Sequence, residues 1–307
     1  MTILVTGANG GFGTAFLPLL RSYYNEPVIG AVREKAASND YVTCDFTDEV
    51  AVKGLMKAVR PRLLFHLVGS FTGQFECDFH VNALSAKFIF DSILTEQLTT
   101  RVVVFGSAAE YGAVLPTDNP VAETQPCHPV SVYGLTKTFQ TDMAMYYART
   151  KNIDVVVARV FNLAVSGLSH RLFYGRSEAM ISAYKRGEIT QLEFGNLDSE
   201  RDYIELDNAA DLILAIAEHG ISGEIYNVGS GVSKKIRHIL MDMLGKEGIP
   251  WGSVVEASSG AIGRKGFDVP IIYADISKVS NLMNTCRIAE VNEVRDRTEI
   301  DACKPYK

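Results

Sequence analysis

The stretch Thr6-Gly7-Ala8-Asn9-Gly10-Gly11-Phe12-Gly13 decides the fold, because it joins a strand predicted over Ile3–Val5 to a helical pattern. Gly7 permits a tight exit from the strand, Gly10 lets the backbone approach a pyrophosphate, and Gly13 lets the helix pack closely on the sheet. The unpaired N–H groups at the start of the helix favour a bound phosphate. The position of the glycines between a strand and a helix therefore predicts a dinucleotide-binding turn.

Short apolar runs alternate with helical patterns throughout the first half of the chain. Strands are predicted over Ile3–Val5, Pro27–Val32, Leu63–Val68, Arg101–Phe105 and Ile153–Arg159, and helices over Thr14–Tyr24, Glu49–Val59, Val81–Leu94 and Val132–Thr150. Such alternation is typical of parallel strands with helical crossovers. We therefore expect an α/β fold of the Rossmann type, a doubly wound parallel sheet with helices on both faces.

The pattern loosens after residue 162, and Gly, Ser and aromatic residues make 162–175 look irregular. The remaining predictions are a strand over Glu224–Val228, a loop over Gly252–Gly266, and helices over Glu178–Tyr184, Asn208–Glu218 (capped by Asp207 or Asn208) and Ile236–Leu244. We expect residues 1–162 with 200–228 to form the NAD(P)-binding Rossmann domain. Residues 163–199 with 229–307 are expected to form a smaller, discontinuous C-terminal substrate-binding lobe.

The end of the second strand bears on the choice of cofactor. An acidic residue there would bind the ribose 2′-hydroxyl of NAD, whereas this strand runs into Arg33, which suits the 2′-phosphate of NADP. With no acid read at the strand end, NADP(H) is favoured and NAD(H) is the alternative. Asp45 is expected either to contact the adenine amine or to cap a helix. The predicted cofactor contacts are Gly7, Asn9, Gly10, Gly11, Phe12, Gly13, Arg33, Asp45, Phe46, Leu67, Val68, Gly69, Asn82, Tyr133, Lys137 and Val160.

The segment Tyr133-Gly134-Leu135-Thr136-Lys137 places Tyr133 and Lys137 on one face of the long helix predicted over Val132–Thr150. A free phenol is a poor acid or base at neutral pH, and a neighbouring ammonium would lower its pKa. Lys137 is also expected to hydrogen-bond the nicotinamide ribose. Ser107 ends a strand at the carboxyl edge of the sheet, where its hydroxyl can orient a substrate carbonyl. Ser107, Tyr133 and Lys137 are therefore the predicted catalytic residues of a hydride transfer.

Composition excludes several other classes of protein. The 307-residue chain has a net charge of −6 and no basic stripe, so no nucleic-acid partner is expected. No apolar run reaches the roughly 18 to 20 residues of a membrane helix, and no secretory leader is read at the start. The five cysteines are scattered without metal-ligand spacing, which favours reduced thiols in the cytoplasm and no metal site. Cys127 and His128 are neighbours in sequence and do not face each other, so a Cys–His nucleophile is not expected.

Together these residues resemble the extended short-chain dehydrogenase/reductase family, which contains nucleotide-sugar epimerases, dehydratases and reductases. The likeness covers nearly the whole chain, and beyond the residues above it rests on Phe65-His66-Leu67, Asn82, Glu110-Tyr111-Gly112, Arg159, Phe161-Asn162, Arg201-Asp202-Tyr203 and Tyr226-Asn227-Val228. The segment 192–196, followed by 201–203 and 226–231, looks most like that of GDP-4-keto-6-deoxy-D-mannose reductases. His66 is expected to be a packed strand histidine and not a catalyst.

The sequence departs from this family at two points. Dehydratases of the family resemble one another in an acidic Ser/Thr-Asp-Glu or Thr-Ser-Glu stretch, where this chain has Ser107-Ala108-Ala109. Alanine cannot move a proton, so the acid and base for water elimination are expected to be missing. The tail after Cys286 and the residues that follow Arg264 also differ from the family pattern, which leaves the substrate lobe less specified than the cofactor site.

The resemblance implies NADPH-dependent reduction of a 4-keto-6-deoxy nucleotide sugar, with Tyr133 as proton donor. It also implies that Asn162, Arg201 and Arg264 hold the nucleotide diphosphate, and the whole predicted substrate site is Ser107, Ala108, Ala109, Asn162, Arg176, Arg201 and Arg264. An NAD-dependent nucleotide-sugar 4-epimerase is the first alternative, and a non-catalytic dinucleotide-sensing protein is the second. The family further implies a homodimer through the helix over Val132–Thr150.

Overall fold

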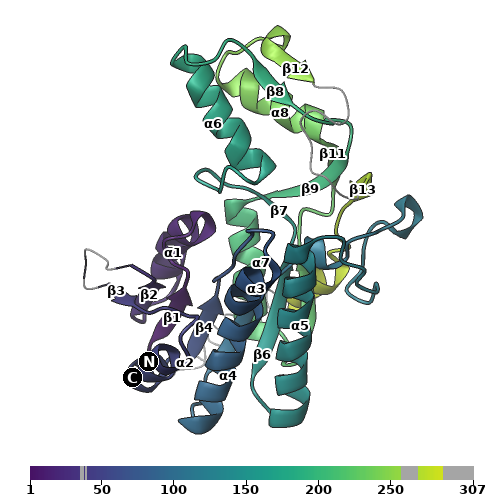
Figure 1. Cartoon of the computed structure of the whole chain (residues 1–307). Helices are drawn as coiled ribbons and strands as arrows, with labels where there is room; N and C mark the ends of the chain where they lie inside the picture. Colours follow the sequence, from purple (N-terminus) through teal and green to yellow (C-terminus); the bar gives the residue numbers. More distant parts are fainter. Residues whose placement is uncertain (35–37, 39, 257–268, 286–307) are drawn as a thin grey trace, which may run out of the picture.

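The computed structural model describes residues 1–34, 38, 40–256 and 269–285 (Figure 1). Its largest element in these residues is a seven-stranded parallel sheet with the strand order β10-β6-β5-β4-β1-β2-β3. The strands are β1 (Ile3–Thr6), β2 (Val28–Val32), β3 (Tyr41–Thr43), β4 (Leu63–His66), β5 (Arg101–Ser107), β6 (Val155–Val160) and β10 (Ile225–Val228). The strand order reverses direction between β1 and β4, so crossovers run to both sides of β1.

Helices cover both faces of the sheet. Helices α1 (Gly11–Tyr23) and α7 (Leu206–His219) bury apolar side chains against one face. Helices α2 (Glu49–Val59), α4 (Ser85–Thr95) and α5 (Val132–Lys151) do so against the other. The predicted doubly wound Rossmann-type fold is therefore confirmed.

The central strands are apolar along their whole length because both of their faces are buried. In β5, Val102 and Val104 join the core under α2, α4 and α5, whereas Val103 and Phe105 join the core under α1 and α7. Successive residues of a strand point to opposite faces, so one valine-rich run supplies both cores.

The helical stretch after β4 is longer than the sequence predicts. It starts with α3 (Phe75–Phe79), continues through a π-helical turn, η1 (His80–Leu84), and runs into α4. Wide turns of this kind are frequent at functional sites. Here the turn carries the buried Asn82, one of the predicted cofactor residues.

A smaller lobe stands above the carboxyl edge of the sheet (Figure 1). It contains α6 (Phe173–Lys185), β8 (Leu192–Phe194), α8 (Ile236–Lys246) and β12 (Val254–Glu256), and β8 pairs with β12. These elements share an apolar cluster of their own, which includes Phe194 and Leu240.

A small second sheet connects the lobe to the large sheet. Its strands are β7 (Asn162–Ala164), β9 (Glu200–Glu205), β11 (Ser233–Lys235) and β13 (Ile271–Ile272). The strands β7, β11 and β13 each pair with β9. The buried Asp202 of β9 holds this junction together. Its carboxylate accepts hydrogen bonds from Ser230 N (2.7 Å), Ser230 Oγ (2.7 Å), Gly231 N (3.0 Å) and Ala274 N (3.1 Å).

Three local predictions were wrong. Residues 162–175 are only partly irregular, because they contain β7 and the first turn of α6. The predicted loop over Gly252–Gly266 begins with the end of a 3-10 turn (Trp251–Ser253) and β12, and the rest of it lies outside the described residues. Helix α7 begins at Leu206, directly after β9, so the extended residue before it is Glu205, and neither Asp207 nor Asn208 is the cap.

Candidate active site

The glycine turn fits a dinucleotide. Gly7 follows β1 with φ of +65°, a conformation that favours glycine, and its carbonyl accepts a hydrogen bond from Gly10 N at 3.0 Å. A Cβ on Gly13 would collide with the carbonyl oxygen of Gly7. No side chain caps α1, so its first N–H groups remain for an anion. Asn9 is exposed beside this turn.

Phe12, although it belongs to the same turn, contributes its ring to the core. The ring stacks on Phe16 with centroids 5.0 Å apart and tilts against Phe105 at 5.8 Å. The ring is partly buried by these contacts.

The end of β2 presents both a base and an acid. Arg33 is exposed, and its guanidinium lies 4.0 Å from a carboxylate oxygen of Glu34. The interpretation that no acid stands near Arg33 is therefore corrected, since Glu34 is the next residue. Asp45 does not cap α2, because its carboxylate accepts from Thr47 N and Thr47 Oγ1, and these bonds lower its pKa. Asp48 is the cap of that helix.

The segment after β4 borders the glycine turn. An added Cβ on Gly7 would lie 3.1 Å from Val68 N and 3.2 Å from the carbonyl carbon of Leu67, so these backbones are in contact range. Asn82 accepts a hydrogen bond from Ser70 N at 2.7 Å and donates to Thr136 Oγ1 at 2.8 Å. Asn82 thus ties this loop to the helical turn that carries the predicted catalytic tyrosine.

Two further predicted cofactor residues, Phe46 and Val160, are buried, and Gly69 is exposed. Val160 pairs with Ser107 across β6 and β5, which places it at the same sheet edge. His66 is fully buried between Thr6 Oγ1 (2.9 Å) and Ser85 Oγ (3.0 Å), and burial lowers its pKa to about 3. A neutral, enclosed imidazole of this kind serves packing, as expected from the sequence.

Ser107 and Tyr133 come together at the carboxyl edge of the sheet. Ser107 is the last residue of β5, and Tyr133 lies in the first turn of α5, whose start is fixed by Ser131 Oγ accepting from Gly134 N at 3.0 Å. Burial of the hydroxyl end of Tyr133 raises its pKa, and a hydrogen bond with the Ser107 side chain offsets only part of that rise. The phenol is therefore protonated at neutral pH.

Lys137 does not act on Tyr133 as the sequence predicts. It is buried, and its ammonium donates to the carbonyl oxygen of Phe105 and to Gln140 Oε1. Burial lowers the Lys137 pKa to about 8, and the charge of Glu110 raises it only in part. The expectation that Lys137 lowers the pKa of Tyr133 is wrong in this structure, because the ammonium is directed to other oxygens.

Glu110 uses both of its carboxylate oxygens to bind other groups of the protein. Its Oε1 accepts from Ser107 N at 2.6 Å, and its Oε2 pairs with the Arg159 guanidinium at 2.8 Å, with both side chains buried. Arg159 also lies over the Tyr111 ring at 4.6 Å. This network fixes the backbone of Ser107 and leaves Glu110 no role in proton transfer to a substrate. Cys127, near the same network, has its pKa raised by burial, which makes its thiol a poor nucleophile.

The predicted substrate residues are spread over three regions of the molecule. Asn162 and Arg201 lie on the small second sheet, where Asn162 Nδ2 donates to the carbonyl of Asp202 at 2.9 Å and Arg201 donates to that of Glu200 at 2.8 Å. Arg176 lies on α6 and donates to the Glu193 carbonyl at 3.3 Å, within the lobe. Ala108 and Ala109 form the 3-10 turn (Ala108–Glu110) after Ser107. Arg264 lies outside the described residues.

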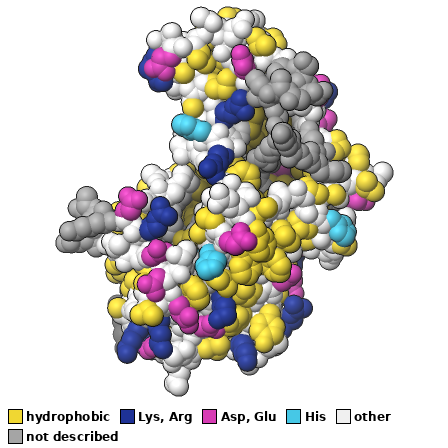
Figure 2. All heavy atoms as spheres, in the orientation of Figure 1, with side chains coloured by type: hydrophobic (Ala, Val, Ile, Leu, Met, Phe, Trp, Pro, Cys, Tyr) yellow, Lys and Arg dark blue, Asp and Glu magenta, His cyan; other side chains and the backbone are white. Residues whose placement is uncertain are grey.

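Sequence reasoning missed several residues that shape the site. Phe71 packs edge-on against the Tyr133 ring, with centroids 5.1 Å apart. Asp78 anchors the loop that carries Phe71, and Arg171 reaches this loop from the segment before α6. On the face shown in Figure 2, Lys and Arg side chains gather around the indentation between the lobe and the body of the molecule. No periodic pattern marks these residues, so no signal in the sequence singled them out.

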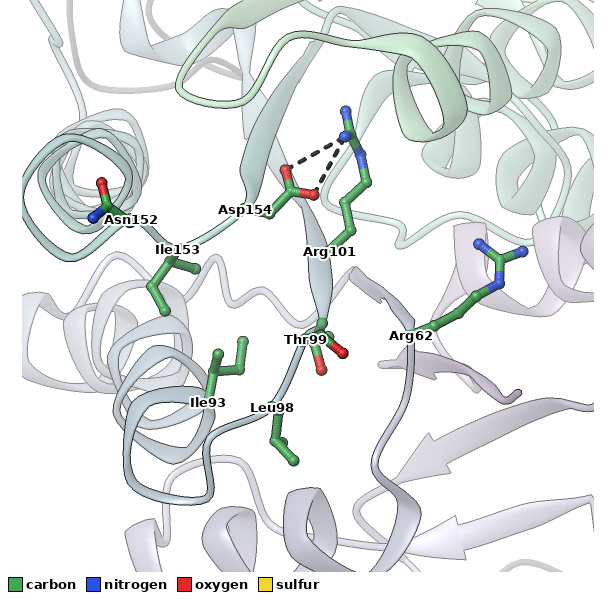
Figure 3. Close-up of a pocket in the computed structure, with 9 residues that line it drawn as sticks. Arg62, Ile93, Leu98, Thr99, Arg101, Asn152, Ile153 and Asp154 are labelled. Carbon is green, nitrogen blue, oxygen red and sulfur yellow. Dashed lines mark hydrogen bonds and ion pairs between the residues drawn. The ribbon is translucent and has the colours of Figure 1, made fainter.

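A pocket lies at the amino edge of the large sheet, opposite the edge that carries Ser107 and Tyr133 (Figure 3). It measures about 390 Å³ and is lined by Arg62, Ile93, Leu98, Thr99, Thr100, Arg101, Asn152, Ile153 and Asp154. Its arginines are already paired, Arg101 with Asp154 at 3.4 Å and Arg62 with Glu26 at 2.7 Å. In the described part of the chain, no cluster of His, Cys, Asp and Glu side chains is arranged to hold a metal ion, and no helix is long and apolar enough to cross a membrane.

A glycine turn on β1 and α1, with Ser, Tyr and Lys at the carboxyl edge of the same sheet, defines an enzyme of the extended short-chain dehydrogenase/reductase type. The chain belongs to the NAD dependent epimerase/dehydratase family, whose sequence pattern matches residues 3–229. The resemblance predicted from the motifs is therefore confirmed.

Individual relatives agree with this assignment. The chain is 26% identical to GDP-6-deoxy-D-talose 4-dehydrogenase of Aggregatibacter actinomycetemcomitans over 299 residues, which cover 96% of this chain and 95% of the relative. It is also 26% identical to GDP-6-deoxy-D-mannose reductase of Pseudomonas aeruginosa over 161 residues, 52% of this chain and 53% of the relative. Among solved structures, RMD from Pseudomonas aeruginosa complexed with NADPH has the same fold, with a TM-score of 0.79, 20% identity, and coverage of 92% of this chain and 91% of that one.

Proposed function

We propose that this enzyme reduces the 4-keto group of a 6-deoxy nucleotide sugar, with NADPH as the favoured reductant and GDP-4-keto-6-deoxymannose as the reference substrate. The observation that carries the proposal is the Tyr133 phenol beside the Ser107 hydroxyl at the carboxyl edge of the sheet. Reduction of a ketone needs an acid in its protonated form, whereas oxidation of an alcohol needs a base. The similarity to a GDP-6-deoxy-sugar dehydrogenase and a GDP-6-deoxy-sugar reductase supports the same carbon and the same class of sugar.

In this proposal the Ser107 hydroxyl orients the keto oxygen, and Tyr133 gives its proton to that oxygen as the alcohol forms. When bound, NADPH supplies the hydride that adds to the keto carbon. Lys137 is proposed to hydrogen-bond the nicotinamide ribose, in addition to the bonds that its ammonium donates to Phe105 and Gln140. The buried Glu110–Arg159 pair fixes the Ser107 backbone.

The dinucleotide would be held by the glycine turn and by the residues after β2, β3, β4 and β6, that is, Gly7, Asn9, Gly10, Gly11, Phe12, Gly13, Arg33, Asp45, Phe46, Leu67, Val68, Gly69, Asn82 and Val160. Arg33 favours the 2′-phosphate of NADP(H). Glu34, 4.0 Å from Arg33, moderates this preference, which keeps NAD(H) as the alternative.

We infer that the discontinuous lobe, residues 163–199 with 229–307, binds the nucleotide sugar above the dinucleotide domain, residues 1–162 with 200–228. Asn162 and Arg201 stand where the two parts join, and Arg176 lies on α6 of the lobe. We propose the same role for Arg264, which lies outside the described residues. Guanidinium groups suit the diphosphate of a nucleotide sugar.

The decisive experiment mixes the purified protein with NADPH and GDP-4-keto-6-deoxymannose and follows the loss of NADPH absorbance. We expect consumption of NADPH and formation of a GDP-6-deoxy sugar, and the Tyr133→Phe variant is the control. If NADPH is not consumed with this or any other keto-sugar nucleotide, the proposal is overturned.

A nucleotide-sugar 4-epimerase with tightly held NAD is the second candidate, since the family includes epimerases. An epimerase takes hydride from its substrate and returns it to the other face of the same carbon, so it holds its dinucleotide and needs no external reductant. Heat release and identification of the bound dinucleotide distinguish the two, because stoichiometric NAD favours the epimerase. A non-catalytic dinucleotide sensor, the third candidate, would keep the fold without need of the Ser107–Tyr133 pair.

We further infer a homodimer in the cytoplasm. Helix α5 exposes Leu135, Phe139 and Tyr146, and Phe139 also packs on Phe79 of α3. An apolar helix face of this kind suits a second copy of the chain. Of the described cysteines, Cys44 and Cys77 are unpaired like Cys127, which suits a reducing compartment. Light scattering after size exclusion would report the oligomeric state.

A further inference from the structure

Phe71 is the side chain that covers Tyr133 from the body of the enzyme. Its ring meets the Tyr133 ring edge-on, with centroids 5.1 Å apart and an interplanar angle of 87°. Edge-to-face pairs of this kind hold both rings in place. Phe71 thus helps to fix the orientation of the phenol ring.

The loop that carries Phe71 is anchored from below by two buried side chains. Asp78 accepts hydrogen bonds from Ser70 Oγ (2.8 Å), Thr72 N (2.8 Å) and Gly73 N (2.9 Å). Asn82 binds both Ser70 N and the Ser70 carbonyl. These bonds reach the backbone on either side of Phe71, so they position its ring without depending on the ring itself.

A third anchor comes from the lobe. The Arg171 guanidinium, in the segment before α6, donates to the carbonyl oxygen of Phe71. The loop is therefore held from both parts of the enzyme. Since this bond also uses the backbone, replacing the Phe71 ring leaves all three anchors available.

We propose that Phe71 is a specificity-determining residue that selects a sugar with a methyl group, and not a hydroxymethyl group, beside the reacting carbon. The inference rests on the proposed function. In a 4-keto sugar the carbon next to the carbonyl bears C6, so this substituent stands two bonds from the carbon that Tyr133 and Ser107 serve. A phenyl ring offers it apolar contact but neither a hydrogen-bond donor nor an acceptor.

A 6-hydroxyl packed against Phe71 would lose water without gaining a partner. A hydrophobic site rejects an added hydroxyl by roughly tenfold to a hundredfold. Phe71 is the feature of the site that makes the 6-deoxy class the better substrate.

The test compares two variants with the same branched side-chain skeleton but opposite polarity, Phe71→Leu and Phe71→Asn, with the wild type. Each is assayed for oxidation by NADP⁺ of GDP-6-deoxymannose or GDP-6-deoxytalose, whichever the wild type accepts, and of the matching 6-hydroxy sugar nucleotide. We expect the wild type and Phe71→Leu to prefer the 6-deoxy sugar by about tenfold to a hundredfold in kcat/KM. Phe71→Asn should lose about tenfold of this preference, partly by gaining activity on the 6-hydroxy sugar.

Equal discrimination by Phe71→Leu and Phe71→Asn, or none by the wild type, would overturn the assignment while leaving the proposed function intact. If the wild type neither oxidises these sugars nor reduces GDP-4-keto-6-deoxymannose with NADPH, the proposed function fails instead. Calorimetric titration of the same sugar nucleotides then still tests Phe71, because a binding preference that follows polarity supports the assignment and one that ignores it refutes it. Thermal unfolding and NADPH affinity serve as folding controls, and Phe71→Met with Phe71→Gln provides a second matched pair.

Discussion

The large parallel sheet and the junction beneath the lobe are stabilised in opposite ways. In the sheet, strands such as β5 and β6 are valine-rich runs whose side chains fill two apolar cores. At the junction, the strand β9 reads Glu-Arg-Asp-Tyr-Ile-Glu, and one buried carboxylate, Asp202, accepts hydrogen bonds from two separate segments, 230–231 and the residue Ala274. In the proposed reaction, the edge of the large sheet carries out the hydride and proton transfer, and the junction takes part in binding the sugar nucleotide.

Substitutions in the two regions should therefore change different properties of the enzyme. Hydrophobic cores tolerate the loss of a single polar contact, whereas a buried polar centre does not. Substitutions at the sheet edge should therefore change turnover more than stability, and substitutions at Asp202 should change stability more than dinucleotide binding.

The largest effect is expected at Tyr133. Tyr133→Phe removes the proton donor and should lower kcat for ketone reduction by about 10²- to 10⁴-fold. Because the phenol does not hold the glycine turn, NADPH affinity by fluorescence titration should stay within about threefold of the wild type. A kcat within tenfold of the wild type would contradict the role of Tyr133 at the sheet edge as the proton donor.

The next effect is expected at the junction. Asp202→Ala leaves the N–H groups of Ser230, Gly231 and Ala274 without their acceptor and should lower the free energy of unfolding by at least about 3 kcal/mol. Trp251, the single tryptophan of the chain, packs on the lobe core and reports this region by fluorescence. In urea its transition should precede that of the helical circular dichroism. Coincident transitions at the wild-type midpoint would contradict this picture.

A smaller, pH-dependent effect is expected at Lys137. Its pKa is about 8 in the folded protein and near 10.5 in the unfolded chain. Between these values the unfolded chain binds the extra proton, so raising the pH favours the folded protein; below about 8 both states are protonated and the cost of burial is fully present. The stability of the wild type relative to Lys137→Met should therefore rise by roughly 2 kcal/mol between about pH 8 and pH 10. A difference independent of pH, measured by urea unfolding across this range, would refute the lowered pKa.

The smallest effect is expected at Asp48, on the exposed side of the sheet domain. Its carboxylate accepts from Val50 N and Ala51 N at the start of α2. Asp48→Ala should cost about 1 kcal/mol of unfolding free energy, with turnover unchanged, and Asp48→Asn should recover most of it. A loss as large as that of Asp202→Ala would erase the proposed contrast between the two regions.

The sheet domain could be predicted from sequence because its signals are local. The glycine turn, the valine runs and the spacing of Tyr133 and Lys137 each lie within one or two adjoining elements. The cap of α7 was mistaken for Asp207 or Asn208 because β9 leads into that helix without the usual loop. The effect of Lys137 on Tyr133 was also mistaken, since the carbonyl of Phe105 that draws the ammonium away comes from another strand.

The junction and the rim of the site could not be predicted in the same way. The partners of Asp202 lie 28 to 72 residues away in sequence, and those of Arg171 about a hundred. Charged strands such as β9 and β11 show no alternation of apolar and polar residues, because their pairing is set by a buried carboxylate. Such contacts depend on where distant segments meet and leave no periodic trace.

Because of the π-helical turn η1 between α3 and α4, the number of residues in this helix affects the geometry of the site. It lets Asp78 and Asn82 face the Phe71 loop while Ile89 and Phe90, further along, face the core. Deleting one residue within 80–84 other than Asn82 would keep every functional group of the site. It would nevertheless rotate the Asp78 side of the helix by about 100° relative to the core side. The position of the Phe71 loop over Tyr133 therefore depends partly on the number of residues in this helix. A substitution at a single position does not change that number.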